Sequence, residues 1–138
     1  MRVLFTESEV PELATRLLKE AGSRKVWLLE GDPGSGKTTL VRELVRQLGS
    51  SDLVQSPTFS ILHEYHAGEQ IIYHLDLYRI NSLEEAFEAG VMECLRGTAY
   101  TFIEWPGLLL PVLEPDFFRI KLGAAPPTGQ NNQREILW

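Results

Sequence analysis

The chain has 138 residues, of which 43% are hydrophobic and 23% charged, and its net charge is −6. These values are typical of a globular domain, and we expect residues 1–138 to form a single one. No apolar stretch reaches the roughly 20 residues that a membrane-spanning helix needs, so we expect no membrane association. A lone cysteine, Cys94, excludes an internal disulfide and favours a cytoplasmic location. The acidic charge argues against direct nucleic-acid binding, which depends on Lys and Arg.

The first third of the chain predicts a helix, a buried strand and a second helix. Apolar residues recur at helical spacing over 10–18, and Gly22 is placed to end that helix. The preceding segment 6–9, Thr-Glu-Ser-Glu, fits a capping box. The short apolar run 26–29 is typical of a strand buried on both faces. Apolar residues at helical spacing over 40–48 then predict the second helix.

The middle of the chain predicts a β-hairpin followed by helical turns. Segments 59–65 and 70–75 are strand-like, and the gap between them is short enough to favour an antiparallel pair. The run 82–85, Ser-Leu-Glu-Glu, is a second capping box and opens a helical stretch. Gly90 and Gly97 interrupt that stretch.

The last third predicts more strands and completes the fold class. We expect strands at 100–103 and 117–122, a loop at 124–133 that is rich in Pro, Gly and Asn, and a final edge strand at 134–138. Because a hairpin cannot be parallel, the sheet should be mixed. The sequence therefore predicts an α/β fold: a single domain of the P-loop NTPase type, with a mixed central sheet, a β-hairpin and flanking helices.

A complete P-loop pattern joins the first buried strand to the second helix. It consists of Gly31, Asp32, Pro33, Gly34, Ser35, Gly36, Lys37 and Thr38, with Thr39 next. The glycines let backbone N–H groups close around phosphate oxygens, and the helix N-terminus adds partial positive charge. Lys37 supplies a full charge near the β- and γ-phosphates, and the Thr38 hydroxyl can ligate Mg²⁺. We therefore expect ATP and Mg²⁺ as cofactors.

Two carboxylates stand where hydrolysis needs a second group on the metal side. Asp76 follows the apolar run 71–75, and Glu104 follows the run 100–103. The sequence leaves open which of them contacts the metal directly, and both can converge on one ion if one acts through water. Thr58 lies after the P-loop helix, where many NTPases place a loop that senses the γ-phosphate; a simple helix-to-strand turn is the alternative.

The histidines and one tryptophan give weaker signals. His63, His66 and His74 do not have the spacing of a metal set, and we interpret them as structural. Trp105, next to Glu104, is interpreted as a core or stacking residue that could respond to nucleotide.

Four motifs in order along the chain together resemble the TsaE (YjeE) family, small bacterial ATPases required to make threonylcarbamoyladenosine in tRNA. The motifs are residues 31–39, Ser-Pro-Thr-Phe at 56–59, His-Leu-Asp-Leu-Tyr-Arg at 74–79 and Ile-Glu-Trp-Pro at 103–106. The likeness extends from about Thr6 to Arg134. The chain departs from the family pattern at four places: Pro33, Ser35, Val10 and the pair Asn132-Gln133.

The resemblance implies roles for individual residues around the phosphates. Lys37 would hold the phosphates and Thr38 would bind Mg²⁺. Asp76 would be essential for hydrolysis, and Glu104 would complete the metal site directly or through water. Thr58 would belong to a switch-like loop.

The resemblance also implies the surroundings of the nucleotide and the partners. Trp105, Glu7 and Arg134 would flank the nucleotide. The partners would be TsaB and TsaD, of which TsaD transfers the threonylcarbamoyl group to tRNA, and ATP hydrolysis would reset that assembly between turnovers. The chain would meet tRNA only indirectly through these partners, in agreement with its acidic charge.

Three other functions fit parts of the same pattern. A GTPase is disfavoured because the Asn-Lys-x-Asp guanine element is absent and the chain is short for that fold. A small-molecule kinase would need a lid that carries arginines, for which Arg79 and Arg96 are the available residues. A nucleotide-gated protein-binding module with incidental hydrolysis would use the same residues as a slow ATPase, and it stays open as the alternative.

Overall fold

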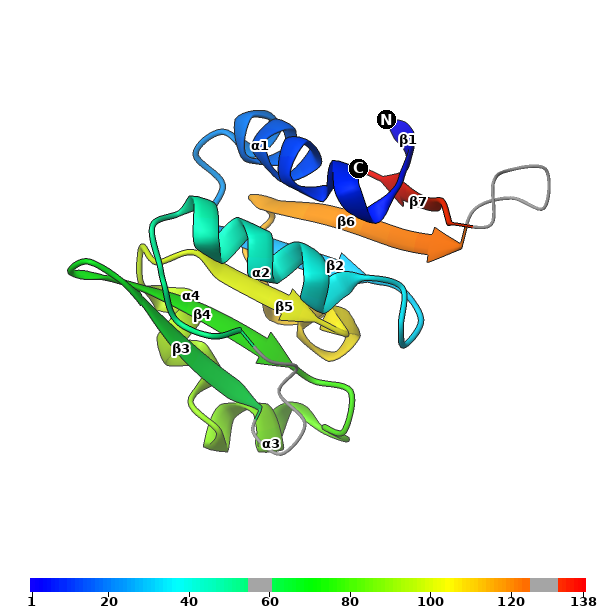
Figure 1. Ribbon diagram of the computed structural model, residues 1–138. Coiled ribbons are helices and arrows are strands. Elements are labelled where there is room, and N and C mark those ends of the chain that lie inside the picture. Colours follow the sequence, from blue (N-terminus) through cyan, green and yellow to red (C-terminus); the bar gives the residue numbers. More distant parts are fainter. Residues whose placement is uncertain (55–60, 125–131) are drawn as a thin grey trace.

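A mixed β-sheet forms the centre of the computed structural model, which describes residues 1–54, 61–124 and 132–138 (Figure 1). Within these ranges the sheet has seven strands in the order β1-β7-β6-β2-β5-β4-β3. The strands are β1 (Arg2–Phe5), β2 (Val26–Glu30), β3 (Leu62–Ala67), β4 (Gln70–Asp76), β5 (Thr101–Glu104), β6 (Phe117–Ala124) and β7 (Arg134–Leu137). The predicted α/β fold with a mixed sheet is confirmed.

The middle of the sheet is parallel and its edges are antiparallel. Strand β2 pairs in parallel with β5 and β6, and β4 pairs in parallel with β5. Trp27, Leu28 and Leu29 of β2 are fully buried, which explains why this strand has a continuous apolar run. The predicted hairpin is confirmed as β3 and β4, paired antiparallel from Leu62↔Leu75 to Ala67↔Gln70.

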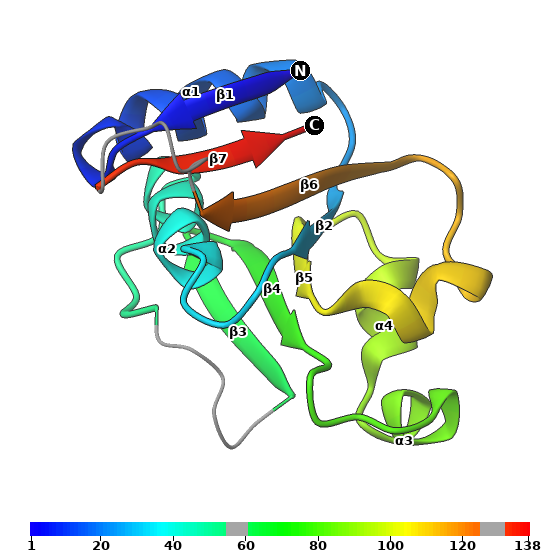
Figure 2. The ribbon, with the colours of Figure 1, turned by 90° about the vertical axis from the view of Figure 1, so that its right-hand side faces the viewer.

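The strand predicted at 134–138 is present as β7, but the prediction that it lies at the edge of the sheet is wrong. Strand β7 lies between β6 and β1, so β1 forms that edge of the sheet (Figure 2). The sequence does not predict the N-terminal strand, because it has four residues and its partner in the described sheet is a segment at the far end of the chain. The Trp138 N–H donates to the Met1 carbonyl oxygen at 3.0 Å, so the first and last residues lie side by side.

Helices cover both faces of the sheet. On one face, α1 (Val10–Ala21) and α2 (Lys37–Gln47) share an apolar cluster with inward residues of the strands. On the other face, α3 (Leu83–Glu88), α4 (Val91–Arg96) and the 3₁₀ helix η2 (Pro106–Val112) pack on a second cluster. A short 3₁₀ helix, η1 (Glu7–Glu9), precedes α1. None of the helices in the described ranges is long and apolar enough to span a membrane.

The expected helix ends are present. The Glu9 carboxylate accepts a hydrogen bond from the Thr6 N–H at 2.6 Å, as a capping box requires. The Ser82 hydroxyl accepts one from the Glu85 N–H at 3.2 Å at the start of α3. Gly22 ends α1 with a φ of 61°. The helix ends, which depend on residues a few positions apart, are therefore predictable from this sequence.

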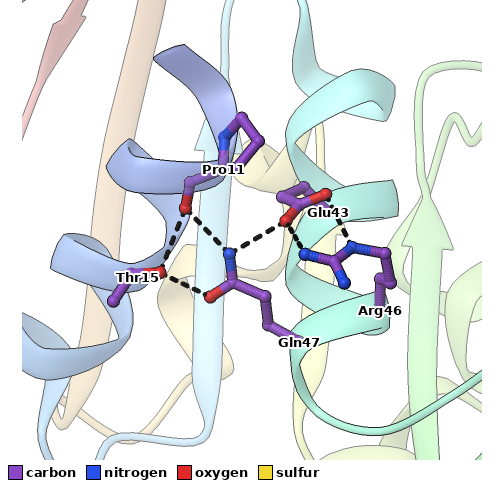
Figure 3. A network of polar contacts seen from close by, with 5 residues as sticks. All are labelled: Pro11, Thr15, Glu43, Arg46 and Gln47. Carbon is purple, nitrogen blue, oxygen red and sulfur yellow. Dashed lines mark hydrogen bonds and ion pairs between the residues drawn. The ribbon is translucent and has the colours of Figure 1, made fainter. Parts of the chain in front are cut away.

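A polar network joins α1 to α2 at their solvent-facing edge (Figure 3). The Gln47 side-chain N–H group donates to the Pro11 carbonyl oxygen at 2.8 Å and to a Glu43 carboxylate oxygen at 2.9 Å. The Thr15 hydroxyl donates to the Gln47 side-chain oxygen at 2.9 Å. Arg46 completes the network by pairing with Glu43. The network fixes the first turns of α1 against α2, and with them η1 immediately upstream.

Replacing Gln47 should therefore destabilise the fold. Gln47→Ala removes three hydrogen bonds at a partly exposed position, and we expect a loss of about 1 kcal/mol, or about 3–5 °C in Tm. Arg42→Ala, on an exposed position of the same helix, is the control and should leave Tm nearly unchanged. Thermal unfolding followed by circular dichroism measures both, and equal Tm values for the two variants would contradict a stabilising role for the network.

Candidate functional site

The parallel strands bring the predicted site residues to one edge of the sheet. Strand β2 ends at Glu30, the loop follows, and α2 begins at Lys37. Strands β4 and β5 end at Asp76 and Glu104, and both run parallel to the β2 direction. Ligands of open α/β sheets bind outside the carboxyl ends of the strands, and this is where the loop and both acids lie.

The loop conformation depends on glycine at two positions in particular. Gly31 has a φ of 151°, and a Cβ atom there would lie 2.6 Å from the Leu122 carbonyl oxygen of β6. Gly36 caps the start of α2 with a φ of 105°. Larger residues resist such backbone angles, and the free N–H groups at the N-terminus of α2 are available to an anion.

Lys37 is enclosed by the loop rather than extended into solvent. Its side chain is 5% exposed. The ammonium group donates to the carbonyl oxygens of Gly31 and Asp32, the latter at 3.1 Å. Burial lowers the pKa of Lys37, and the nearby carboxylates, that of Glu104 foremost, oppose this shift. The lysine is thus held as a positioned donor inside the loop.

Asp76 and Glu104 lie side by side beneath the start of α2. They are register partners on β4 and β5, so their side chains emerge on the same face of the sheet. On the other side of β5, Glu104 is in register with Leu29, which packs in the cluster beneath α1 and α2. Both acids therefore face the helix that carries Lys37.

The two acids have different environments. The Asp76 carboxylate accepts a hydrogen bond from the Tyr78 N–H at 2.9 Å. Burial raises the pKa of Asp76, the Tyr78 N–H opposes this, and the charge of Glu104 adds to the rise. Glu104 is 3% exposed, and its Oε2 lies 2.5 Å from Nε2 of His74, a fully buried residue.

A cavity of about 1190 Å³ opens above these groups. It is lined by most of the residues expected to contact nucleotide or metal: Glu7, Pro33, Gly34, Gly36, Lys37, Thr38, Thr39, Asp76, Glu104, Trp105 and Arg134. Part of its wall is apolar and consists of Phe5, Val10, Leu40 and Ile80. The structure thus places residues from both ends of the chain and from three strand ends around one cavity.

Three of the predicted site residues that the structure describes are not in that lining. Gly31, Asp32 and Ser35 form the back of the loop, where the Ser35 hydroxyl is buried without a hydrogen-bond partner in the described part of the chain. A Cβ at Gly31 would approach this hydroxyl within 2.6 Å, so the two residues pack tightly. Thr58 and its motif, residues 56–59, lie outside the described residues.

Arg134 and Trp105 reach the loop from different directions. The Arg134 side chain passes 3.7 Å from the position that a Cβ on Gly36 would take. The Trp105 ring centre lies 4.6 Å from the Lys37 ammonium nitrogen, which is within range of a cation–π contact. Trp105 has a φ of 56°, an unusual angle for a bulky residue, and this turn directs the chain from β5 into η2.

Sequence reasoning missed two residues of the site. Tyr78 packs its ring on Trp105, with ring centres 4.8 Å apart, and is 61% exposed at the cavity rim. His74, which we interpret from the sequence as structural, has its Nε2 2.5 Å from the Glu104 carboxylate. One signal could have found it: His74 precedes Asp76 by two residues in a strand, so both side chains point to the same face.

The residues present fit a nucleoside triphosphate with a magnesium ion. The loop side of the cavity carries the backbone N–H groups at the start of α2, the buried Lys37 and the Thr38 hydroxyl. The carboxylates of Asp76 and Glu104 face these groups. Among the residues that the structure describes, no three His, Cys, Asp or Glu side chains gather as a metal site. The two facing carboxylates, Asp76 and Glu104, suit Mg²⁺, which proteins hold through one or two carboxylates together with substrate phosphates.

Comparison with known proteins gives concordant matches. Residues 4–136 match the family model described as "Threonylcarbamoyl adenosine biosynthesis protein TsaE". A tRNA threonylcarbamoyladenosine biosynthesis protein TsaE from Rickettsia conorii is 37% identical over 135 residues, covering 97% of this chain and 74% of that protein. One of the same name from Bacillus subtilis is 35% identical over 111 residues, covering 80% and 66%. The crystal structure of Bacillus subtilis YdiB superposes with a TM-score of 0.70 at 29% identity, covering 99% of this chain and 83% of YdiB.

The raised pKa of Asp76 predicts that this carboxylate costs stability when no ligand is bound. A raised pKa means that folded protein binds the Asp76 proton more tightly than unfolded protein, in which aspartates titrate near about 3.9. Stability is therefore lost as pH rises from that value through the folded-state pKa, and the loss persists at neutral pH. Asp76→Asn removes the charge, while its side-chain oxygen can still accept the Tyr78 N–H.

We expect Asp76→Asn to have a higher Tm than the unaltered protein at neutral pH, without nucleotide or metal. The difference should shrink as pH falls towards about 4, where the carboxyl is protonated in both states. Thermal unfolding over this pH range measures it, with Asp116→Asn, at an exposed position, as the control. A stabilisation that grows on acidification would contradict the sign of the shift.

Proposed function

This chain belongs to the TsaE family, and we propose that it binds ATP with Mg²⁺ on residues 31–39 and hydrolyses the ATP in support of tRNA threonylcarbamoyladenosine biosynthesis. One observation carries the proposal: the buried Lys37 ammonium faces two carboxylates, Asp76 and Glu104, across a single cavity at the carboxyl edge of the sheet. Phosphates and a divalent cation match this pairing of charges better than a neutral ligand would.

The loop and Lys37 would bind the phosphates. Backbone N–H groups at the start of α2 point into the cavity with the positive end of the helix dipole. Lys37 is already tethered to loop carbonyl oxygens, so little side-chain entropy is lost when it donates to a phosphate oxygen. Arg134, alongside Gly36, can add a second positive charge from the rim.

The two carboxylates and Thr38 would serve the metal side of the site. Mg²⁺, when bound, neutralises charge that develops on the phosphates during transfer. The Thr38 hydroxyl and Glu104 would hold this ion, with Glu104 acting directly or through water. Asp76 lies nearer the opening and would orient the attacking water, a task for which a half-buried carboxylate with a raised pKa is suited.

We infer the place of this activity in the cell from the family. We expect the chain to act on a TsaB–TsaD pair and to reset that assembly through ATP hydrolysis, with tRNA reached only through these partners. The relatives' names and the match over residues 4–136 support the pathway. The net charge of −6 favours docking on protein rather than on RNA.

Lys37→Ala should severely weaken nucleotide binding. The substitution removes the buried positive charge that faces the phosphates, and we expect at least a 100-fold loss of affinity for ATP, roughly 3 kcal/mol. Titration calorimetry with ATP and Mg²⁺ measures it. Lys19→Ala, at an exposed position on α1, is the matched control and should bind as the unaltered protein does. Tight binding by Lys37→Ala would remove the phosphate assignment.

Asp76→Ala should separate binding from hydrolysis. We expect ATP affinity to change little and the hydrolysis rate to fall by about 100-fold or more, because the general base or water-orienting group is lost. Asp116→Ala is the matched control. Rates are measured with the chain alone and with a TsaB–TsaD pair, which should raise the rate of the unaltered protein. Tight ATP binding by the unaltered protein, without hydrolysis in either condition, would instead favour a nucleotide-gated binding module.

A further inference from the structure

A buried histidine connects the deeper of the two site carboxylates to the hairpin. His74 is fully buried, and Glu104 and Tyr65 are each 3% exposed. Nε2 of His74 lies 2.5 Å from Oε2 of Glu104, and Nδ1 lies 3.4 Å from the Tyr65 hydroxyl. The three residues stand on β5, β4 and β3, so the chain of polar contacts crosses the hairpin side of the sheet.

The strand registers explain why these side chains meet. His74 is in register with Phe102 on β5, two residues before Glu104, and with His63 on β3, two residues before Tyr65. Residues two apart in a strand share a face, so all of these side chains emerge beneath α2. The contact between His74 and Glu104 is therefore a diagonal one within the sheet, and it needs no distortion.

We propose that His74 is a positioning residue for Glu104: its Nε2–H holds one carboxylate oxygen, which leaves the other oxygen to the cation that accompanies the nucleotide. This inference rests on the proposed function. Within the described ranges, His74 is the hydrogen-bond partner of the Glu104 carboxylate, whereas Asp76 is fixed by a backbone N–H. The second oxygen of Glu104 has no hydrogen-bond partner there, although the residue lines the cavity.

The electrostatics of the site show what would follow if this contact were lost. A buried carboxylate without a donor is unfavourable, and Glu104 lies beside both the like charge of Asp76 and the ammonium of Lys37. A released Glu104 would be drawn to Lys37 and would compete with phosphate for it. His74 prevents this by a charge-assisted hydrogen bond on the side of Glu104 that faces the hairpin. Contacts of this kind behind a metal ligand typically contribute 10–100-fold to metal affinity or activity.

A matched pair of variants isolates the hydrogen bond. His74→Gln places an amide N–H at nearly the position of Nε2, whereas His74→Asn has the same amide one methylene too short to reach Glu104. Each is titrated with the non-hydrolysable analogue AMP-PNP by calorimetry, once with Mg²⁺ and once with EDTA. We expect His74→Asn to lose about 10-fold or more of the affinity that Mg²⁺ adds, with its affinity in EDTA retained, and His74→Gln to recover most of it.

A double-mutant cycle distinguishes positioning from a general packing role. In a Glu104→Gln background, His74→Asn should cause no further loss of the affinity that Mg²⁺ adds, because its effect passes through the carboxylate. An equal further loss in that background would overturn the proposal, as would an unchanged Mg²⁺ effect in His74→Asn alone. If the unaltered protein gains no AMP-PNP affinity from Mg²⁺, the proposed function fails together with this inference. If it does gain affinity and only the His74 variants behave otherwise than expected, this inference alone fails.

One measurement needs no folded variant of His74. In the unaltered protein, ring ¹⁵N–¹H correlations of the three histidines report on their imidazoles. Addition of Mg²⁺ to the AMP-PNP complex should shift the His74 ring signals, since the charge on Glu104 is then shared with the cation, and should leave those of the exposed His66 in place. Unmoved His74 signals would overturn the proposal.

Discussion

The site depends on the alignment of three parallel strands. Glu104 is in register with Leu29 on one side and with Asp76 on the other, so β2, β5 and β4 end together. Six loop residues connect the end of β2 to Lys37, and they bring the start of α2 back over the same edge of the sheet. A shift of one residue in β5 would turn Glu104 to the opposite face of the sheet and bring apolar Ile103 beneath α2. The apolar core on both faces fixes this register and therefore the distance between the lysine and the acids.

The buried charges at that edge compensate one another only in part. Burial lowers the pKa of Lys37, and the acids oppose the shift; burial raises the pKa of Asp76, and Glu104 adds to the rise. Asp76 and Glu104 thus place two adjacent negative charges beside the one enclosed positive charge of Lys37. Two adjacent like charges are unfavourable in the free protein, and the entry of a cation, as proposed above, would relieve their repulsion.

Features governed by near neighbours in sequence were predictable, and features governed by distant pairing were not. The P-loop, the caps at Thr6 and Ser82 and the hairpin each depend on fewer than twenty consecutive residues, and the sequence indicates all of them. The position of β7 inside the sheet depends on β1, more than a hundred residues away, and four residues carry too little alternation to reveal such a strand. The contact of His74 with Glu104 likewise spans two strands that are joined by more than twenty residues.

The unexpected pairing of β1 with β7 has a consequence for the site. Phe5 and Arg134 are register partners at the end of that pair nearest the loop, so the last residue of β1 and the first residue of β7 reach the cavity together. Beyond Phe5 the chain turns into η1, which brings Glu7 to the rim, and the network around Gln47 holds the following helix against α2. Both ends of the chain thus build the wall opposite Asp76 and Glu104. Hydrogen bonds to β6 on one side and to β1 on the other hold β7 in line with the loop, and the Arg134 side chain therefore lies against Gly36.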